Sequence, residues 1–353
     1  MRRSTKMRIL HCVSSLKVGG AEKCVKNLAK VQSEKNLHVE VLSFGDKCDA
    51  FQREIEDLGI NVINIKGSLV KRLWRTAKVI MKFSSVHIHS PAVIKALVPI
   101  FPILLFKNVI YTIHGEVEPP IGFVKGSHKL ARLYLNNIFA VSESIKQGIR
   151  TRYGWTPSTV TVVNNGVYCP PTPNLIAQQP FLNLCTVCRL VPLKKISQLV
   201  EEFAHRNIAE HAILNIFGDG PERAHIDALI DEHSLHGAVV LHGEVLDEDA
   251  IYARQDLLLI NSTTEGLPMS LLEAMARGIP PLSTSVGQIP NIITQNENGF
   301  TYPVDDTDSW YTLLLSQIQN RDNLKQIGQR AFAFVKQHYT IDDVSAVYEA
   351  TYR

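Results

Sequence analysis

Short apolar runs alternate with amphipathic stretches along most of the chain. In the first half these runs have the length and composition of buried strands. They lie at 8–14, 38–44, 60–65, 86–89, 109–113, 138–142 and 159–163. Residues with helical spacing separate most of them. This strand–helix alternation predicts an α/β fold, in which a parallel sheet carries helices on both faces.

The second half repeats the alternation. Its strand-like runs lie at 182–188, 212–217, 239–241 and 257–260, and its last helical patterns at 307–318, 321–336 and 341–351. Between the halves, residues 168–180 are rich in proline and lack apolar periodicity, which is typical of a linker. We therefore predict an N-terminal domain over 1–167 and a C-terminal domain over 181–337, followed by a final helical segment over 338–353.

The chain of 353 residues has a net charge of +3, but the two halves differ. Residues 1–175 contain 25 Lys and Arg against 11 Asp and Glu, and the remainder contains 12 against 23. A basic first half predicts an anionic partner, such as a membrane surface, a nucleic acid or an acidic acceptor. Nucleic acid is disfavoured because the basic half lacks the interleaved aromatic residues of a stacking platform.

One basic stretch, residues 66–83, is predicted to be an amphipathic helix with Trp74 and Phe83 on its apolar side. Such a helix can lie in an anionic membrane surface, or it can pack on a sheet and turn its cations to solvent. Both alternatives stay open. The strongly apolar stretch 91–106 is predicted to belong to the core.

No apolar run reaches the roughly 18 residues of a membrane span, and the N-terminus lacks a signal-peptide pattern. The six cysteines are widely spaced. These features predict a soluble cytoplasmic protein with reduced thiols. Cys185 and Cys188 form a Cys-x-x-Cys pair, but no second pair completes a zinc site, so buried free thiols are favoured.

The most informative stretch runs from Asn261 to Pro280. It places Glu265 on a loop after a buried strand and Glu273 in the helix that follows, with Pro268 predicted at the first helical position. A helix N-terminus attracts phosphate, whereas carboxylates accept hydrogen bonds from hydroxyl groups. The combination predicts a nucleotide sugar as the ligand.

This stretch resembles the signature of the large retaining GT-B glycosyltransferase family, with Glu-Gly-Leu-Pro at 265–268 and Leu-Glu-Ala-Met-Ala-x-Gly-x-Pro at 272–280. The resemblance implies two Rossmann-like domains facing a cleft, without a catalytic metal or a cofactor other than the donor. It also implies that the last helix crosses back onto the first domain. Glu265, with Gly266 and Leu267, is expected to hold the donor sugar, and Glu273 the ribose.

In the first half the same resemblance covers the Gly-Gly-Ala-Glu string, so Gly19 and Gly20 are expected beside the donor diphosphate and Glu22 beside the acceptor. His114 follows a strand, and ligands of open α/β sheets bind outside the carboxyl ends of strands. The family has a histidine beside the reacting sugar at this point. Glu116 is a further candidate on the acceptor side.

In the second half, Arg189 and Lys194 match the two cations of the family's Gly-Arg-Leu…Lys-Gly pattern. Arginine can donate two parallel hydrogen bonds to a diphosphate, and lysine can bind it through a single charged ammonium group. Cys188 and Lys195 stand where the family has glycines, which leaves the choice between the two lysines open; Lys194 is favoured.

Three more loops complete the expected donor site. Gly218 and Gly220 lie in Gly-Asp-Gly-Pro-Glu, which the family places beside the nucleotide, and His242 and Gly243 lie where its backbone holds the base. In the stretch 283–291 the chain matches the family only in part, since Gln288 and Asn291 are departures. They are expected to lie away from the catalytic groups.

Together these observations predict a retaining, metal-independent transfer of a hexosyl or N-acetylhexosaminyl unit from a nucleoside diphosphate sugar, with a UDP-sugar favoured. The acceptor is expected to be a glycan or a lipid-linked precursor of cell-surface polysaccharide or lipopolysaccharide, at the cytoplasmic face of an anionic inner membrane. Two other functions remain open. One is a nucleotide-sugar epimerase of the same fold, and the other is a non-catalytic sugar-nucleotide-binding subunit.

Overall fold

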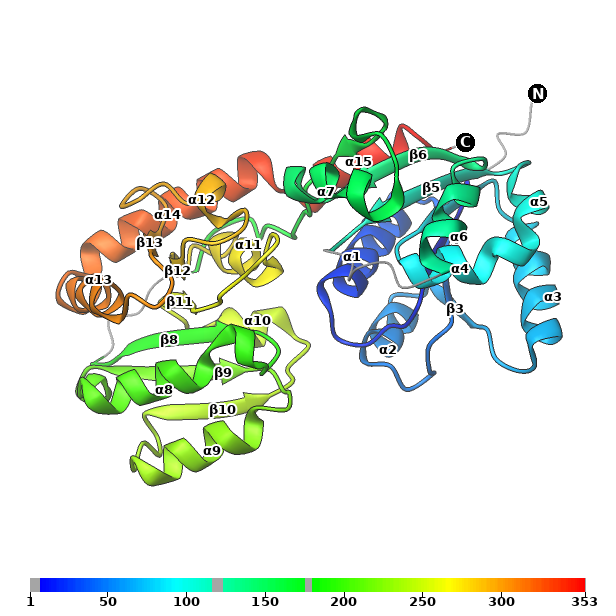
Figure 1. Ribbon diagram of the computed structural model, residues 1–353. Helices are drawn as coiled ribbons and strands as arrows, with labels where there is room; N and C mark the ends of the chain where they lie inside the picture. Colours follow the sequence, from blue (N-terminus) through cyan, green and yellow to red (C-terminus); the bar gives the residue numbers. More distant parts are fainter. Residues whose placement is uncertain (1–6, 116–122, 175–179, 353) are drawn as a thin grey trace. The chain divides into compact units, whose positions relative to one another are not determined.

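The computed structural model describes residues 7–115, 123–174 and 180–352, except for the side chains of residues 123–125. The chain forms two compact units (Figure 1). Unit 1 consists of Met1–Gly166 together with Ile341–Arg353, and unit 2 consists of Val167–Thr340. Glu116, one of the predicted acceptor-side residues, lies outside the described residues.

Among the described residues, unit 1 is built on a seven-stranded parallel sheet in the order β3-β2-β1-β4-β5-β6-β7. The strands are β1 (Arg8–Val13), β2 (His38–Ser43), β3 (Asn61–Asn64), β4 (Ser85–Ile88), β5 (Asn108–Ile113), β6 (Leu135–Ala140) and β7 (Thr161–Val162). The helices are α1 (Gly20–Glu34), α2 (Ala50–Asp57), α3 (Leu69–Ile80), α4 (Pro91–Leu97), η1 (Val98–Ile100), α5 (Phe101–Leu104), α6 (Phe123–Ala131), α7 (Glu143–Tyr153), η2 (Pro157–Thr159) and α15 (Ile341–Glu349).

Unit 2 has a parallel sheet of six strands in the described part of the chain, in the order β10-β9-β8-β11-β12-β13. The strands are β8 (Leu182–Val187), β9 (Ala212–Phe217), β10 (Val239–Gly243), β11 (Leu257–Ile260), β12 (Pro281–Thr284) and β13 (Phe300–Tyr302). The helices are η3 (Pro192–Lys194), α8 (Ile196–His205), η4 (Ile208–Glu210), α9 (Arg223–Glu232), α10 (Glu248–Tyr252), α11 (Met269–Met275), α12 (Ile289–Ile292), α13 (Thr307–Gln319) and α14 (Arg321–His338).

Strand order explains where ligands can bind in each unit. The chain builds one side of the sheet outwards from β1 and then returns to add β4 on the other side. The same reversal occurs between β8 and β11 in unit 2. The loops that follow two such strands diverge, and ligands of open α/β sheets bind in the crevice between them. The parallel α/β architecture predicted from the apolar pattern is confirmed in both units.

The final helix, α15, packs within unit 1. The helix and the residues after it make polar as well as apolar contacts: Lys35, at the C-terminal end of α1, pairs with Glu349 at 3.0 Å, and the Asn108 amide donates to the Thr351 carbonyl at 2.6 Å. The Tyr348 and Tyr352 rings are buried against the sheet. The last residues of the chain therefore form part of the same core as the first strand.

Several boundaries differ from the sequence prediction for physical reasons. The helix predicted over 66–83 is shorter, because α3 ends at Ile80 and Phe83 enters the core. Prolines at Pro99 and Pro102 divide the stretch 91–106 into three short helices, since proline lacks the N–H that a continuous helix needs. Pro268 precedes α11 in an extended conformation and is not its first residue. β12 and β13 were not predicted as strands.

In the described part of the chain, no helix combines the length and the apolar character needed to span a membrane.

Candidate active site

Glu265 lies on the loop that follows β11, at the carboxyl edge of the unit 2 sheet. Its side chain is only 11% exposed and forms an ion pair with the Lys194 ammonium group. The Ser262 hydroxyl donates a second hydrogen bond to the same carboxylate oxygen at 2.6 Å. The carboxylate is therefore partly desolvated and held in one orientation from two sides.

Lys194 reaches Glu265 because of the backbone conformation around it. It ends the short helix η3, and Lys195 then adopts a left-handed conformation with φ of +50°. Glycine suits this conformation best, in keeping with the glycine expected at this position from the resemblance. The change of direction sends the Lys195 side chain to Asp305. Of the two lysines, Lys194 is thus the one beside Glu265.

Arg189 follows β8 on the neighbouring loop and is exposed. Cys188, just before it, is a half-buried free thiol, and burial raises the pKa of this thiol to about 11. Cys185 is buried in β8 and is also a free thiol, as predicted. The Cys-x-x-Cys pair is thus part of the strand and loop that carry Arg189.

The Arg189 loop and the Gly218–Gly220 loop are packed backbone against backbone. A Cβ atom on Gly218 would lie 1.9 Å from the Cys188 carbonyl oxygen, and one on Gly220 would lie 2.2 Å from the Leu190 carbonyl oxygen. The Leu190 amide donates to the Asp219 carbonyl at 2.9 Å. In this structure the absence of a side chain at the two glycines therefore allows the two loops to pack closely together.

His242 and Gly243 end β10. The His242 ring stacks on Phe217 with a centroid distance of 4.4 Å and bonds to the Asn215 side chain at 2.8 Å. Desolvation lowers the pKa of His242. The Gly243 carbonyl accepts from the Gly218 amide at 2.7 Å, so the end of β10 is hydrogen-bonded to the loop that follows β9.

The Glu265 loop is closed from the other side by a residue that sequence reasoning did not single out. Gly287 has a φ of +58°, and a Cβ atom there would lie 1.9 Å from the Glu265 carbonyl oxygen. The next amide, on Gln288, donates to the Gly266 carbonyl at 3.0 Å. The prediction that Gln288 lies away from the catalytic groups is therefore wrong. No atom of the described residues lies within 4 Å of a Cβ atom built on Gly266, and Leu267 is buried.

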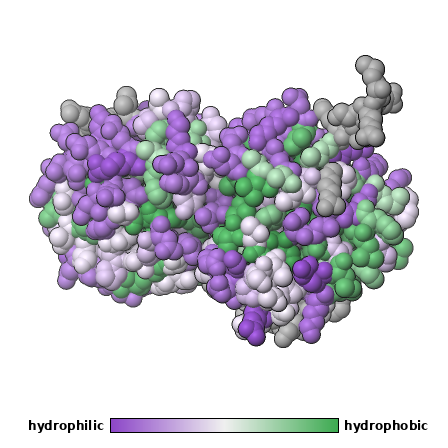
Figure 2. Space-filling view, turned by 90° about the horizontal axis from the view of Figure 1, so that it is seen from above, coloured by the Kyte–Doolittle hydropathy of each residue, from purple (hydrophilic) through white to green (hydrophobic). Residues whose placement is uncertain are grey.

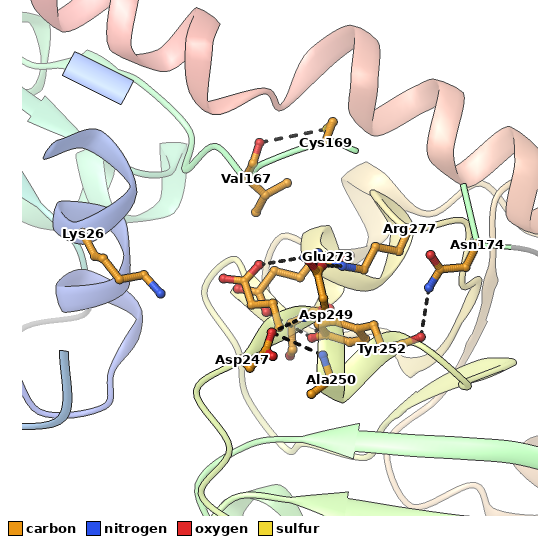
Figure 3. Close-up of polar contacts among 12 residues, drawn as sticks. Lys26, Val167, Cys169, Asn174, Asp247, Asp249, Ala250, Tyr252, Glu273 and Arg277 are labelled. Atoms are coloured by element: carbon orange, nitrogen blue, oxygen red, sulfur yellow. Dashed lines mark hydrogen bonds and ion pairs between the residues drawn. The ribbon is translucent and has the colours of Figure 1, made fainter. Parts of the chain in front are cut away.

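Glu273 is buried in α11, within a polar cluster shown in Figure 3. The Tyr252 hydroxyl donates to its carboxylate at 3.0 Å, and the Arg277 guanidinium donates to its backbone carbonyl at 3.3 Å. Arg277 also lies over the Tyr252 ring and pairs with Asp249 at 2.8 Å. The helix α11 has only seven residues, so side chains rather than a helix dipole define the electrostatics here.

Two Asp-x-Asp tripeptides occur in unit 2, and such pairs can hold a metal ion on a diphosphate. Here Asp247 caps α10 and Asp249 pairs with Arg277 (Figure 3). Asp306 caps α13, and Asp308 pairs with Arg206 at 2.6 Å. These carboxylates thus serve helix ends and ion pairs.

Unit 1 carries a separate set of predicted residues. Gly19 precedes α1 and Gly20 opens it, while Glu22 lies in its first turn. A Cβ atom on Gly19 would lie 2.4 Å from a Glu22 carboxylate oxygen, so the absence of a side chain gives this carboxylate room. Burial raises the pKa of Glu22.

His114 follows β5, and its Nε2 lies 2.9 Å from His89 Nδ1. Burial lowers the pKa of His114 to about 4, so the ring is neutral at physiological pH. Its Nδ1 is also buried and has no hydrogen-bond partner among the described residues. The ring is therefore oriented from one side and keeps one nitrogen for another group.

Two family models match the chain. The model of glycosyl transferases group 1 matches residues 176–334, and that of glycosyltransferase family 4 matches residues 18–169. The chain belongs to the group 1 glycosyltransferases. The matched ranges include all the predicted site residues of both units.

This glycosyltransferase is 29% identical over 160 residues to N-acetyl-alpha-D-glucosaminyl L-malate synthase of Bacillus anthracis, over 45% of this chain and 42% of the relative. It is 25% identical over 227 residues to the gpi3 subunit of phosphatidylinositol N-acetylglucosaminyltransferase from Schizosaccharomyces pombe, over 62% of this chain and 48% of the relative. The matches thus span less than half the length of these curated relatives.

Solved structures share the fold of the glycosyltransferase. Anabaena HepE in complex with UDP and glucose superposes with a TM-score of 0.81 at 19% identity, covering 98% of this chain and 99% of that chain. A mutant of S. aureus TarM in complex with fondaparinux, alpha-GlcNAc-glycerol and UDP gives a TM-score of 0.78 at 13% identity, with 98% and 99% coverage. These likenesses bear out the two-domain, Rossmann-like GT-B fold.

Proposed function

We propose that this glycosyltransferase moves a hexosyl or N-acetylhexosaminyl unit from a nucleoside diphosphate sugar to a hydroxyl group of a glycan or lipid-linked acceptor. A UDP-sugar is the favoured donor. Support comes from HepE and TarM, whose structures hold UDP, and from the two relatives whose names refer to N-acetylglucosaminyl groups.

The observation that carries this proposal is the ion pair between Lys194 and Glu265, with Arg189 on the adjacent loop. A carboxylate and two cations at one sheet edge suit the two ends of a donor, since hydroxyl groups donate to carboxylates and diphosphates bind cations. When the diphosphate departs, its negative charge grows, and cations fixed in advance stabilise it. Lys194 and Arg189 take this role, so no metal ion is needed on the diphosphate.

The remaining donor contacts follow from the same loops. Glu265 binds hydroxyl groups of the donor sugar, with Gly266 and Leu267 beside it. Glu273 accepts hydrogen bonds from the ribose. Attack on the face from which the diphosphate leaves gives retention, and the diphosphate oxygen that the cations hold then accepts the proton of the incoming hydroxyl group.

Calorimetric titration with UDP, GDP and ADP tests the proposal. One nucleotide should bind to the wild type, and Lys194→Asn should weaken it about tenfold, the effect of one charge-assisted hydrogen bond. Lys195→Asn is the matched control, because it removes the same charge one residue away and asparagine tolerates the left-handed backbone. Absence of binding, or equal weakening by both variants, would overturn the donor assignment.

We further propose that unit 1 contacts an anionic membrane through a surface formed by α3 and by the residues that directly follow α3 and α5. Its apolar residues are largely exposed: Leu69, Val70, Trp74, Met81, Leu105 and Phe106. Figure 2 shows apolar residues gathered over the part of unit 1 where α3 and α5 lie in Figure 1.

The structure separates the two aromatic residues expected on one apolar side of this helix, because Phe83 enters the core and Trp74 does not. Trp74 is 63% exposed, and the Lys78 ammonium group lies 5.0 Å from its ring centre. Aromatic rings flanked by cations suit the boundary between headgroups and acyl chains. The opposite face of α3 packs on the core through Thr76 and Ile80. The helix can therefore pack on the sheet and still present a membrane-binding surface.

A further inference from the structure

Four histidines gather at the carboxyl ends of three neighbouring strands in unit 1. His11 lies in β1, His87 in β4, His89 just after β4, and His114 after β5. Three of them form a continuous chain: His114 Nε2 lies 2.9 Å from His89 Nδ1, and His89 Nε2 lies 2.9 Å from His11 Nδ1. The inner end of this chain is Gln32 on α1, whose Oε1 lies 2.8 Å from His11 Nε2.

A second branch leaves the same glutamine. Its Nε2 lies 3.3 Å from the Tyr352 hydroxyl, which lies 2.7 Å from His87 Nδ1. His87 Nε2 lies 2.8 Å from Thr112 Oγ1, which contacts the Tyr348 hydroxyl at 3.3 Å. The Gln32 amide thus joins two branches, and the second one includes residues of the last segment of the chain.

The histidines of this network are neutral. Burial lowers the pKa of His11 and of His114 to about 4, and it lowers the pKa of His87 and His89 well below the usual value. A neutral imidazole has one donor nitrogen and one acceptor nitrogen. Each ring of the chain therefore passes on the direction of the hydrogen bond it receives, and one group sets the tautomer of His11, His89 and His114.

That group is the Gln32 amide. If its oxygen faces His11, then His11, His89 and His114 all carry the proton on Nε2; if its NH₂ faces His11, all carry it on Nδ1. N–H···O bonds run at about 2.7–3.2 Å and O–H···O bonds at about 2.5–3.0 Å. The 2.8 Å contact fits His11 N–H donating to oxygen, and the 3.3 Å contact to Tyr352 exceeds the O–H···O range by more than the N–H···O range. Both distances favour the first arrangement, in which the amide oxygen faces His11.

We propose that the Gln32 amide, acting through His11 and His89, fixes His114 as the Nε2–H tautomer and thereby presents His114 Nδ1 as an acceptor for a substrate hydroxyl group. His114 Nδ1 has no partner among the described residues, which leaves this position for the hydroxyl. Gln32, His11 and His89 are positioning residues. The identity of the hydroxyl as part of a sugar substrate rests on the proposed function, whereas the tautomer does not.

A cation is the other ligand that a histidine cluster can hold. One nitrogen from each of His11, His87 and His89 lies within 4.8 Å of the others. However, all six nitrogens of these rings already have a hydrogen-bond partner in the protein. A bound cation would have to break several of these bonds, so the cluster is a hydrogen-bond network.

Nitrogen NMR of the ¹⁵N-histidine-labelled full chain tests the tautomer directly, with His114→Asn used to assign the His114 signals. The expected result is the Nε2–H form at His11, His89 and His114. The Nδ1–H form at His114 would overturn the proposal. So would stoichiometric Zn²⁺ that shifts the His11, His87 and His89 signals, because it would mean that the cluster is a cation site.

Two variants test the transmission. Gln32→Met keeps the volume but removes the amide, so His114 should populate both tautomers and kcat should fall about tenfold, the effect of one misdirected hydrogen bond. Tyr348→Phe is the matched control at the far end of the other branch, and it should leave the His114 tautomer unchanged. Equal spectra for Gln32→Met and wild type would refute the role of Gln32. Nucleotide binding should stay unchanged in both variants, which separates this test from that of the donor site.

Discussion

Lys194 and Glu265 form an ion pair at the carboxyl edge of the unit 2 sheet, while the adjacent Lys195 pairs with Asp305. Both lysines make one ion pair, but their surroundings differ. The Lys194 and Glu265 side chains are 18% and 11% exposed, whereas Asp305 is 61% exposed. Solvent screening weakens the second pair, so only the first holds its charges in a fixed and partly desolvated position.

This difference predicts unequal effects of removing the two carboxylates. Glu265→Gln keeps the shape of the side chain but loses the charge that binds Lys194, and kcat/KM should fall about a hundredfold. Asp305→Asn, the control, should change it by no more than about twofold. The kcat/KM of both variants is measured with the donor that the nucleotide titration identifies. A Glu265→Gln enzyme within a few fold of wild type would contradict the assigned role.

Gly287 should tolerate substitution far less than Gly266, although both adjoin the same loop. Gly287→Ala would place a Cβ atom against the Glu265 carbonyl in a left-handed backbone, and the free energy of unfolding should drop by roughly 3 kcal/mol. Gly266→Ala meets no described atom within 4 Å and should cost no more than about 0.5 kcal/mol. Denaturant unfolding of the two variants measures the difference in the free energy of unfolding. Equal losses of stability would show that the Glu265 loop shifts to accommodate the added methyl group.

The histidine network predicts that stability falls as the solution becomes acidic. The pKa of His11 is about 4 in the folded chain against 6.5 for the ordinary side chain, so the unfolded chain binds more protons between these values. Stability from this residue is complete above pH 6.5 and is lost as pH falls towards 4, by up to roughly 3 kcal/mol.

Denaturant unfolding between pH 4 and 7 measures this dependence. His11→Gln should flatten the slope relative to wild type. His236→Gln should not, because His236 pairs with Asp231 on the surface, where both side chains are about 70% exposed. If both variants had the wild-type slope, the pH dependence would come from other groups.

The α3 surface predicts binding to anionic vesicles. Arg75 and Lys78 are exposed on α3, and each cation near such a surface contributes about 1 kcal/mol. Replacing both by Gln should therefore weaken partitioning roughly thirtyfold. Replacing Lys129 and Arg150 by Gln removes the same charge from other exposed positions of unit 1 and should have little effect. Equal partitioning of the two double variants in a sedimentation assay would argue against this surface.

The apolar pattern alone was sufficient to predict most of the fold. β1, β5, β8, β9 and β11 each fall within a residue or two of the predicted runs, because strands of a parallel sheet are buried on both faces and form continuous apolar segments. The Ser142 side chain accepts a hydrogen bond from the Ile145 amide and so caps α7, a role that serine commonly has at helix starts. β12 and β13 were missed because their residues, Pro-Leu-Ser-Thr and Phe-Thr-Tyr, do not form continuous apolar runs. The sequence could not separate Trp74 from Phe83, because helical periodicity does not show which part of an apolar side meets the core.

For the site, the sequence determined which residue types follow which strands: Glu265 after β11, Arg189 after β8 and His114 after β5. The tertiary structure decided how they are held. The left-handed backbone at Lys195 directs the Lys194 side chain, and not that of Lys195, to Glu265. The fold also places Gly287 against the Glu265 backbone. It also brought Gln32 to Tyr352 across 320 positions of the chain. These hydrogen bonds and close backbone contacts join atoms that are far apart in sequence, so local periodicity cannot predict them.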